Sequence, residues 1–349
     1  EVNPEFGTFE DFKNLVDKAH EAGMLVILDW VANHTGWDNP WITANPEWYT
    51  HDSTGKIVPP VPDWSDVADL NFDDEAMKAA MIDAMEFWVT EAGVDGYRCD
   101  AAAMAPTIFW KEALLNLDSI RPVVKLAEAW EPELLDNGFD AAYGWEFHHL
   151  LNEIAAGKEE LSAIESYIDK TDTLYADDDI LLNFITNHDE NSWAGTEYER
   201  MGEYVDGFAA LTYLMPGIPL IYTGQEAGLN KRLEFFEKDT VSFSDTSLFS
   251  FYRTLNDLKQ RNPALYAGIN GGEVFVKTDT IADWLAILRV KDTDKVLGLF
   301  NFSDAPVQVK IPIKDASGKY TDVFTNKTFK IGRNSYVALN PWEIAILEN

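Results

Sequence analysis

Four carboxylic acids stand at similar places in the sequence, each at the end of a short strand-like run. They are Asp29, Asp100, Glu128 and Asp189. A single acid in such a place usually caps a helix or lies in a solvated loop, but four at equivalent positions are hard to explain as caps. A pair of nearby carboxyl groups suits the cleavage of a glycosidic bond. One can protonate the leaving oxygen while the other, ionised, attacks or stabilises the sugar carbon.

The stretch "DGYRCDAAAM" (95–104) places a cation beside one of these acids. Side chains alternate between the two faces of a strand, so Arg98 and Asp100 are predicted to share a face. A guanidinium there would keep Asp100 ionised and oriented, as a nucleophile requires, and the alternative is a purely structural ion pair. Cys99, the only cysteine, excludes an intrachain disulfide and is expected to be an inert buried thiol.

Strand-like and helix-like runs alternate from the start of the chain to about residue 262. Thr8 and Asp11 resemble a capping box that opens the first helix, and residues 74–92 predict a second, amphipathic helix. Six strand-like runs follow the first helix, beginning with "MLVILDW" (24–30). Such alternation is typical of a parallel sheet with right-handed crossovers. In a barrel built this way, catalytic groups converge at the carboxyl ends of the strands.

Two regions depart from this alternation. Residues 35–70, rich in Trp, Pro, Asn and Asp, are predicted to form a long irregular loop. From residue 263 onward the pattern changes to short strand-like runs such as "WLAILRV" (284–290), with turn residues between them. We therefore predict a barrel domain over residues 1–262, with 35–70 as a short inserted domain, and an antiparallel β-sandwich over residues 263–349.

The chain of 349 residues is strongly acidic, with 60 acidic against 27 basic residues and a formal charge of −33. Such a field repels phosphate backbones and anionic lipid, so we expect no nucleic-acid or membrane partner and favour a neutral substrate. No apolar run reaches the length of about 18 residues that a membrane helix needs. The chain starts at Glu1 without a signal-like stretch. That leaves the compartment open, and we favour a secreted or periplasmic location over a cytoplasmic one.

Four segments of the chain resemble the ordered signature regions of the α-amylase family of glycoside hydrolases. They are "LDWVANH" (28–34), "GYRCD" (96–100), "AEAW" (127–130) and "FITNHD" (184–189). Two further segments are similar to family segments at the eighth barrel strand and in the inserted loop domain, namely "GIPLIYTGQE" (217–226) and "VADLN" (67–71). One such motif alone would be weak, but the order and separations match across the whole chain.

The resemblance implies an α/β fold, in which a (β/α)8 barrel carries a small domain after its third strand and is followed by an antiparallel β domain. It implies a retaining glycoside hydrolase that cleaves α-1,4-glucosidic bonds in starch, glycogen or maltooligosaccharides through a covalent glycosyl-aspartate intermediate. The alternative is a transglycosylase or α-glucosidase of the same family, because specificity lies in loops that the motifs do not fix. A chain that only binds glucan, without turnover, is a third interpretation.

Matched residue by residue, the resemblance assigns roles at the predicted site. Asp100 is similar to the nucleophile, Glu128 to the general acid/base, and Asp189 to the third carboxylate, which binds sugar hydroxyls. Arg98 would orient Asp100. A retaining mechanism further predicts that the carboxyl groups of Asp100 and Glu128 stand roughly 5–5.5 Å apart. The implied contacts with the sugar are those of His34 and His188. Apart from the resemblance, aromatic rings can stack on sugars, and the aromatic residues at or near the strand ends that could line the site are Trp30, Trp64, Trp130 and Tyr143. For Trp130 the alternative is a packing role.

The chain departs from the family pattern at its start. Its strands begin at what the family counts as the third, so the barrel is expected to be N-terminally incomplete in this chain. An open sheet would expose its edge and part of the apolar core. We therefore expect a longer parent chain or a cleaved product, with self-association through exchanged elements as the alternative.

A second departure concerns metal binding. Many family members hold a structural calcium, and Asn33 and Asp69 match two of its side-chain ligands. The position four residues after Asp100, often histidine in calcium-dependent members, is Met104, and a thioether is a poor ligand for calcium. The resemblance thus suggests Ca²⁺ at this site while Met104 argues against it. Ala103 stands where endo-acting members often carry lysine, which leaves the preferred chain length open.

Overall fold

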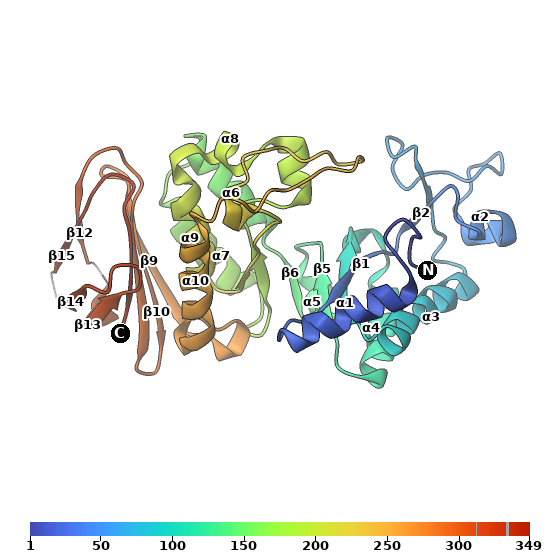
Figure 1. The fold of residues 1–349 in the computed structure, drawn as a ribbon, viewed down its shortest axis with the longest axis horizontal. Coiled ribbons are helices and arrows are strands. Elements are labelled where there is room, and N and C mark those ends of the chain that lie inside the picture. The colour runs from blue at the N-terminus through green and yellow to red at the C-terminus, as the bar shows by residue number, and fades with distance from the viewer. Residues whose placement is uncertain (312, 333–334) are drawn as a thin grey trace. The chain divides into compact units, whose positions relative to one another are not determined.

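The computed structural model describes residues 1–311, 313–332 and 335–349 of the chain (Figure 1). The described chain divides into two compact units, Glu1–Tyr143 and Gly144–Asn349. Each of the six predicted barrel runs contains a strand, four in the first unit and two in the second. Within each unit these barrel strands pair in parallel, as the alternation with helices predicted.

The first unit is built on a parallel sheet with the strand order β1-β4-β5-β6. Its strands are β1 (Ile27–Val31), β4 (Gly96–Asp100), β5 (Val124–Ala127) and β6 (Ala141–Tyr143). Its longer helices are α1 (Phe9–Glu21), α3 (Glu75–Glu91), α4 (Thr107–Ile120) and α5 (Pro132–Asp136). Every residue of β4 is buried except the last, Asp100, which is half-buried. The strand therefore runs through the core and ends at Asp100, whose carboxylate lies at the partly exposed end of the sheet.

Local sequence signals fix the starts of the first two long helices. Thr8 Oγ1 accepts a hydrogen bond from the Asp11 amide at 3.1 Å, and the Asp11 carboxylate accepts one from the Thr8 amide at 2.8 Å. Asp74 precedes α3, and its carboxylate accepts hydrogen bonds from the amides of Ala76 and Met77. Both helices thus begin at a side chain that satisfies their free amides, which confirms the predicted capping box and the predicted second helix.

Gly96 allows β4 to approach β5 closely. Its φ is +149°, and a Cβ at this position would lie 1.9 Å from the carbonyl oxygen of Val124. A larger residue would clash with backbone, which cannot rotate away as a side chain can. The glycine at the start of β4 therefore sets the spacing of the two strands whose far ends carry Asp100 and Glu128.

Residues 35–70 are more regular than predicted. An antiparallel ribbon pairs β2 (His34–Gly36) with β3 (Val67–Asp69), and the short helix α2 (Trp41–Ala44) lies between them in sequence. The rest of the segment consists mostly of turns and irregular structure, as predicted, and the ribbon was not predicted. The ribbon places His34 opposite Asp69.

In its described residues, the second unit contains two parallel strands, five α-helices and an antiparallel β domain. The strands are β7 (Leu181–Asn183) and β8 (Ile218–Pro219). The helices are α6 (Trp145–Ala155), α7 (Ala163–Leu174), α8 (Glu197–Met201), α9 (Val205–Leu214) and α10 (Phe249–Arg261), with a π-helix at Glu190–Ala194. The antiparallel strands are β9 (Glu273–Asp279), β10 (Trp284–Lys291), β11 (Asp294–Asn301), β12 (Val307–Lys310), β13 (Gly318–Asp322), β14 (Thr328–Ile331), β15 (Tyr336–Leu339) and β16 (Ile344–Glu348).

The β domain shares a core with the helices of its unit. Its main sheet has the order β14-β13-β16-β11-β10-β9, while β12 pairs with β15. One face of β10 and β11 packs with α6 to α10 in a common apolar cluster that includes Leu285 and Ile287. Arg289 on β10 is buried and donates a 2.9 Å hydrogen bond to the carbonyl of Leu214, the last residue of α9. The predicted boundary at residue 262 falls between α10 and β9.

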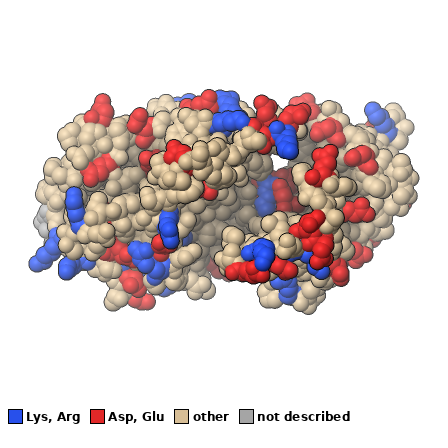
Figure 2. All heavy atoms as spheres, in the orientation of Figure 1, with Lys and Arg blue, Asp and Glu red and all other residues tan. Residues whose placement is uncertain are grey.

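Acidic side chains are spread over the surface of both units on the face shown in Figure 2, with Lys and Arg scattered among them. The formal charge of −33 is therefore not gathered in one patch on that face. Within residues 1–311, 313–332 and 335–349, no helix combines the length and the apolar character needed to cross a bilayer.

Glu165 links α7 to the β domain and gives a pH-dependent contribution to stability. Its carboxylate accepts hydrogen bonds from Lys277 Nζ at 2.7 Å and from the amide and hydroxyl of Thr278 at 2.8 and 2.7 Å. Burial alone would raise the pKa of Glu165, but these bonds outweigh it and lower that pKa. A lowered acid pKa contributes stability above the unfolded-state value, and the contribution is lost as the pH falls through the folded-state value.

We therefore expect Glu165→Gln to lower the free energy of unfolding by about 1 kcal/mol at pH 7. The difference from the wild-type chain should shrink as the pH falls below about 4. Urea unfolding of both proteins across this range measures it, with Glu159→Gln as the exposed control. A difference that does not depend on pH would show that the charge on Glu165 makes no contribution.

Candidate active site

One guanidinium holds three of the predicted carboxylates in the first unit. Arg98 Nη1 donates hydrogen bonds to Asp29 Oδ1 at 2.8 Å and to Asp100 Oδ1 at 2.7 Å. Its Nη2 lies 2.9 Å from Glu128 Oε1, which is an ion-pair distance although the hydrogen-bond geometry is poor. The parallel register of β1 and β4 places Asp29 opposite Arg98, so the ends of three adjacent strands meet at one cation.

Arg98 stays charged despite its burial. Burial lowers the pKa of the guanidinium, but the facing oxygens of Tyr143, Glu128 and Asp29 raise it above its ordinary value. Arg98 Nε also donates a hydrogen bond of 3.3 Å to the Tyr143 hydroxyl, and the guanidinium carbon lies 5.6 Å from the centre of that ring. A planar group with several donors can hold different carboxylates at once, which a lysine ammonium cannot do in the same geometry.

The backbone after Asp100 is bent toward Glu128. Ala101 has φ of 41°, a left-handed conformation that is uncommon for residues other than glycine. Its amide donates a 2.9 Å hydrogen bond to Glu128 Oε2, and the amide of Glu128 donates one of 2.9 Å to the Cys99 carbonyl. The segments that carry the two predicted catalytic carboxylates are thus tied together directly. A strained residue retained at this point is typical of a functional site.

His34 lies close to this cluster with a neutral ring. Burial lowers its pKa, and the negative charges of Asp100, Asp66 and Asp69 oppose that effect only in part. His34 Nδ1 is buried and has no hydrogen-bond partner among the residues that the structure describes. The ring packs edge-on against Trp64 with 5.7 Å between the centroids. A neutral imidazole can bind a hydroxyl group through a ring nitrogen that a ligand can reach, and the sugar contact of His34 stays a prediction.

The two residues matched to the calcium site offer few oxygen ligands. Asn33 Oδ1 is buried without a hydrogen-bond partner in the described part of the chain, but Asn33 Nδ2 lies 3.5 Å from Met104 Sδ. Burial raises the pKa of Asp69, which disfavours its charged form. No group of three or more His, Cys, Asp and Glu side chains that could hold a metal occurs within the described ranges. Calcium prefers six to eight oxygens, including those of Asn side chains and backbone carbonyls, so its binding here stays a prediction and we derive no step through a metal.

Asp189 and His188 lie side by side in the second unit, just after β7. His188 Nε2 is 3.4 Å from Asp189 Oδ2. The next residue, Glu190, opens the π-helix, and its carboxylate lies 3.0 Å from the buried His148 and 3.8 Å from Arg200. The hydrogen bond with His148 lowers the pKa of Glu190. This buried contact anchors the turn that presents Asp189, and π-helical turns occur frequently at functional sites.

The predicted aromatic contacts differ in exposure. Trp130, two residues after Glu128, is 52% exposed and can therefore meet a ligand. Trp30 is less accessible, because it packs edge-on against the buried Tyr97 with 5.3 Å between the centroids. Cys99 is fully buried, which confirms the predicted buried position, and burial raises the pKa of its thiol.

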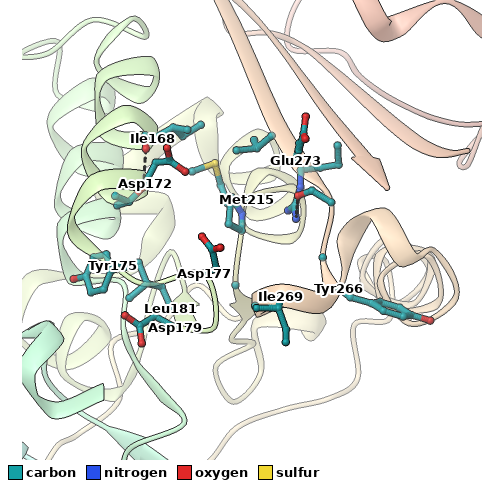
Figure 3. A pocket seen from close by; sticks show the side chains of 18 of the residues that line it. Ile168, Asp172, Tyr175, Asp177, Asp179, Leu181, Met215, Tyr266, Ile269 and Glu273 are labelled. Atoms are coloured by element: carbon teal, nitrogen blue, oxygen red, sulfur yellow. Dashed lines mark hydrogen bonds between the residues drawn. The ribbon is translucent and has the colours of Figure 1, made fainter. Parts of the chain in front are cut away.

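A cavity of about 400 Å³ in the second unit is a different feature from the predicted site. It is lined by Leu181 at the start of β7 and by Gly217 just before β8, whereas Asp189 follows the other end of β7. Figure 3 shows Asp177 pointing into this cavity and Tyr266 pointing away from it. The predicted catalytic residues Asp100, Glu128 and Asp189 are not among the residues that line it.

The contacts that Arg98 makes with Asp29 and with Tyr143 were not predicted from the sequence. Both residues stand at the ends of predicted strands, so their positions were available from the sequence. Their contact with Arg98 depends on the register between strands, which no local pattern specifies.

Removal of Arg98 should be costly, because it leaves three neighbouring carboxylates without their cation. We expect Arg98→Met to lower the free energy of unfolding by about 3 kcal/mol. Urea unfolding at pH 7 measures this, with Arg253→Met as the exposed control, for which a change below about 1 kcal/mol is expected. Equal stability of the Arg98 variant and the wild type would mean that the cluster does not depend on this cation.

Comparisons with known proteins agree with the geometry. The family model described as "Alpha amylase, catalytic domain" matches residues 1–56 and 47–116. Alpha-amylase 3 of Dictyoglomus thermophilum is 30% identical over 272 residues, which cover 66% of this chain and 52% of that protein. The cyclomaltodextrin glucanotransferase of Geobacillus stearothermophilus is 26% identical over 408 residues, covering 99% of this chain and 54% of that protein.

Among solved structures, a noncanonic maltogenic alpha-amylase, AmyB from Thermotoga neapolitana, matches with a TM-score of 0.88 and 26% identity. The match covers 100% of this chain and 83% of that one. It confirms the predicted fold, an α/β barrel architecture with a C-terminal antiparallel β domain. The chain spans about half the length of the two curated relatives named above.

Proposed function

Because the chain belongs to the alpha-amylase family of glycoside hydrolases, we propose that it is a retaining enzyme acting on α-glucans. The proposed substrates are starch, glycogen and maltooligosaccharides, and the proposed reaction is hydrolysis of α-1,4-glucosidic bonds. The observation that carries the proposal is the contact of a single guanidinium, that of Arg98, with both Asp100 and Glu128.

In the first proposed step Asp100 is the nucleophile. Its carboxylate oxygen attacks the anomeric carbon, and the bond from that carbon to the glycosidic oxygen breaks with its electron pair remaining on the oxygen. Glu128 donates a proton to that oxygen, so the leaving chain departs as a neutral alcohol. The hydrogen bond from Arg98 supports this step by fixing the attacking carboxylate in one orientation.

In the second proposed step Glu128 acts as a base. It takes a proton from water, whose oxygen attacks the same anomeric carbon, and the ester bond to Asp100 breaks with its electrons returning to the carboxylate. Two inversions at one carbon retain the α configuration, and one water is consumed. The hydrogen bond from the Ala101 amide keeps Glu128 beside Asp100 for both transfers.

The remaining proposed roles concern binding of the sugar. Asp189, with His188 beside it, would accept hydrogen bonds from sugar hydroxyls, and the neutral ring of His34 would contact another. The exposed ring of Trp130 would stack on a sugar face, since the face of an aromatic ring carries partial negative charge that attracts polarised C–H groups. None of these groups takes part in the bond changes themselves.

Product analysis on soluble starch and maltoheptaose tests the proposal. We expect new reducing ends and shorter maltooligosaccharides, with the first product in the α configuration as read by proton NMR. A β-configured first product would contradict the retaining mechanism. Absence of any turnover would favour the interpretation of a chain that binds glucan only.

Transglycosylation is the second candidate. It is supported by the sequence match to a cyclomaltodextrin glucanotransferase, which extends over nearly the whole of this chain. The two reactions share the glycosyl-Asp100 intermediate and differ in whether water or a sugar hydroxyl accepts the glycosyl group. The same assay with added glucose or maltose as acceptor separates them. If the products were mostly longer chains or rings, transglycosylation and not hydrolysis would be the main activity.

A further inference from the structure

Three large aromatic side chains stand exposed beside the turn that carries Asp189. Trp193 is 60% exposed, Phe235 42% and Phe236 73%. They touch one another: the ring centroids of Phe235 and Phe236 are 4.9 Å apart, and those of Trp193 and Phe235 are 5.0 Å apart. Single exposed apolar residues are normal on a protein surface, but a contiguous exposed group marks a binding surface more often. We call Trp193, Phe235 and Phe236 the Trp193 platform.

The platform is held in place by hydrogen bonds beneath it. Asn191 is fully buried, and its side-chain amide donates to the carbonyl of Lys231 at 3.1 Å while its oxygen accepts from the amide of Leu233 at 2.8 Å. Ser192 Oγ donates to the Leu233 carbonyl at 2.8 Å. These bonds join the π-helix that carries Trp193 to the segment that leads into Phe235. A surface whose two halves are fixed before binding loses little conformational freedom on binding.

The platform is continuous with the proposed sugar-binding residues of the same unit. The ring of Phe235 stacks on that of His188 with 6.3 Å between centroids and an interplanar angle of 20°. His188 in turn lies 3.4 Å from Asp189. The aromatic surface thus begins at the residues proposed to bind sugar hydroxyls and extends outward from them.

We infer that the Trp193 platform binds glucosyl rings of an α-glucan chain beyond those held by His188 and Asp189. The occupant follows from the chemistry of the surface. It consists of flat aromatic rings rather than aliphatic side chains, it adjoins hydroxyl-binding groups, and the strongly acidic chain disfavours anionic ligands. The inference rests on the proposed function for the identity of the sugar, and it assigns to these residues a preference for longer chains.

Binding of maltoheptaose to an Asp100→Asn protein tests the inference without turnover. Isothermal titration calorimetry would compare this parent with the platform variant, which is the same protein carrying both Trp193→Ala and Phe236→Ala. The expected result is a loss of affinity of about tenfold or more, the usual size for removal of an aromatic stacking partner. Tyr336→Ala, which removes a 60% exposed aromatic residue from β15, is the matched control and should leave the affinity unchanged. Trp193→Phe should restore most of the loss.

Several results would overturn the inference. One is an unchanged affinity of the platform variant for maltoheptaose, when its near-ultraviolet circular dichroism spectrum and melting temperature match those of the parent and so show that it is folded. Another is a parent protein that binds no maltoheptaose. A third is a platform variant that alters only the sedimentation coefficient, which would identify the surface as an interface between copies. Platform-dependent binding without turnover by the wild-type chain would instead refute the proposed hydrolysis and leave the inference standing. If the wild-type chain hydrolysed maltoheptaose but the platform variant bound it as tightly as the parent, the inference would be refuted and the proposed hydrolysis would stand.

Discussion

The Asp100→Asn protein is expected to fold normally and to lose activity on maltooligosaccharides by about 10⁴-fold or more. An amide cannot attack the anomeric carbon as a carboxylate does, so no glycosyl-enzyme can form. The fold should tolerate the change because Asn is isosteric and Arg98 keeps its contacts with Asp29 and Glu128. Initial rates on maltoheptaose, measured together with the melting temperature, check both parts of this expectation.

The control for this variant is Asp304→Asn, which alters an exposed acid of the β domain and should leave the rate unchanged. Retained activity in the Asp100 variant would show that another carboxylate attacks the sugar. If the variant were inactive and also unfolded, its loss of activity would come from loss of the fold and would not test the role of Asp100 as the nucleophile. In that event Asp100→Glu, which keeps the charge but displaces the oxygen, provides the second test.

The second large effect is expected for Glu128→Gln, and its size should depend on the leaving group. With natural maltooligosaccharides the leaving oxygen needs a proton, so loss of the general acid should reduce kcat/KM by about 10²- to 10⁴-fold. With an aryl glucoside whose phenolate departs unprotonated, the first step should lose much less. The ratio of the two losses reports proton donation separately from any general damage to the site.

Steady-state kinetics on maltotriose and on a nitrophenyl maltoside measure that ratio, with Glu112→Gln on the exposed side of α4 as the control. Equal losses on both substrates would count against Glu128 as the proton donor. The structural basis of the expectation is local, because Glu128 is fixed by Arg98 on one oxygen and by the Ala101 amide on the other.

Much of the fold follows from patterns in the sequence. The apolar run that ends in Asp29 and the "GYRCD" run both become parallel strands, and the two acids leave the core at the same end of the sheet. Alternation of side chains correctly put Arg98 and Asp100 on one face, as their 2.7 Å hydrogen bond shows. These features depend on neighbours along the chain, which is why periodicity is sufficient to predict them.

The shared contact at Arg98 could not be predicted in the same way. It requires Asp29 to stand opposite Arg98 on the neighbouring strand, and a shift of one residue would send the acid to the other face. The left-handed backbone at Ala101 also has no local signal, since alanine rarely adopts it and nothing in "CDAAAM" requires it. Tertiary packing sets both features.

Short or distant elements account for the other differences. The strand β14 (Thr328–Ile331) was not predicted from the sequence. The contact of Glu190 with His148 joins residues far apart in the sequence, and neither belongs to a motif. The Trp193 platform similarly combines one aromatic residue from "ENSWA" with two from "LEFFEK", and only folding brings them together.

The most direct test of the proposed mechanism is to trap its covalent intermediate. A 5-fluoro-α-glucosyl fluoride carries an excellent leaving group, while its ring fluorine slows hydrolysis of the resulting ester, so a retaining enzyme accumulates the glycosyl-enzyme. Peptide mass spectrometry of the inactivated protein should find a single fluoroglucosyl group on the carboxylate of Asp100, and maltose should protect against labelling. Labelling of Glu128 or Asp189 instead, or turnover of the reagent to a β-configured sugar without any labelled peptide, would contradict the account.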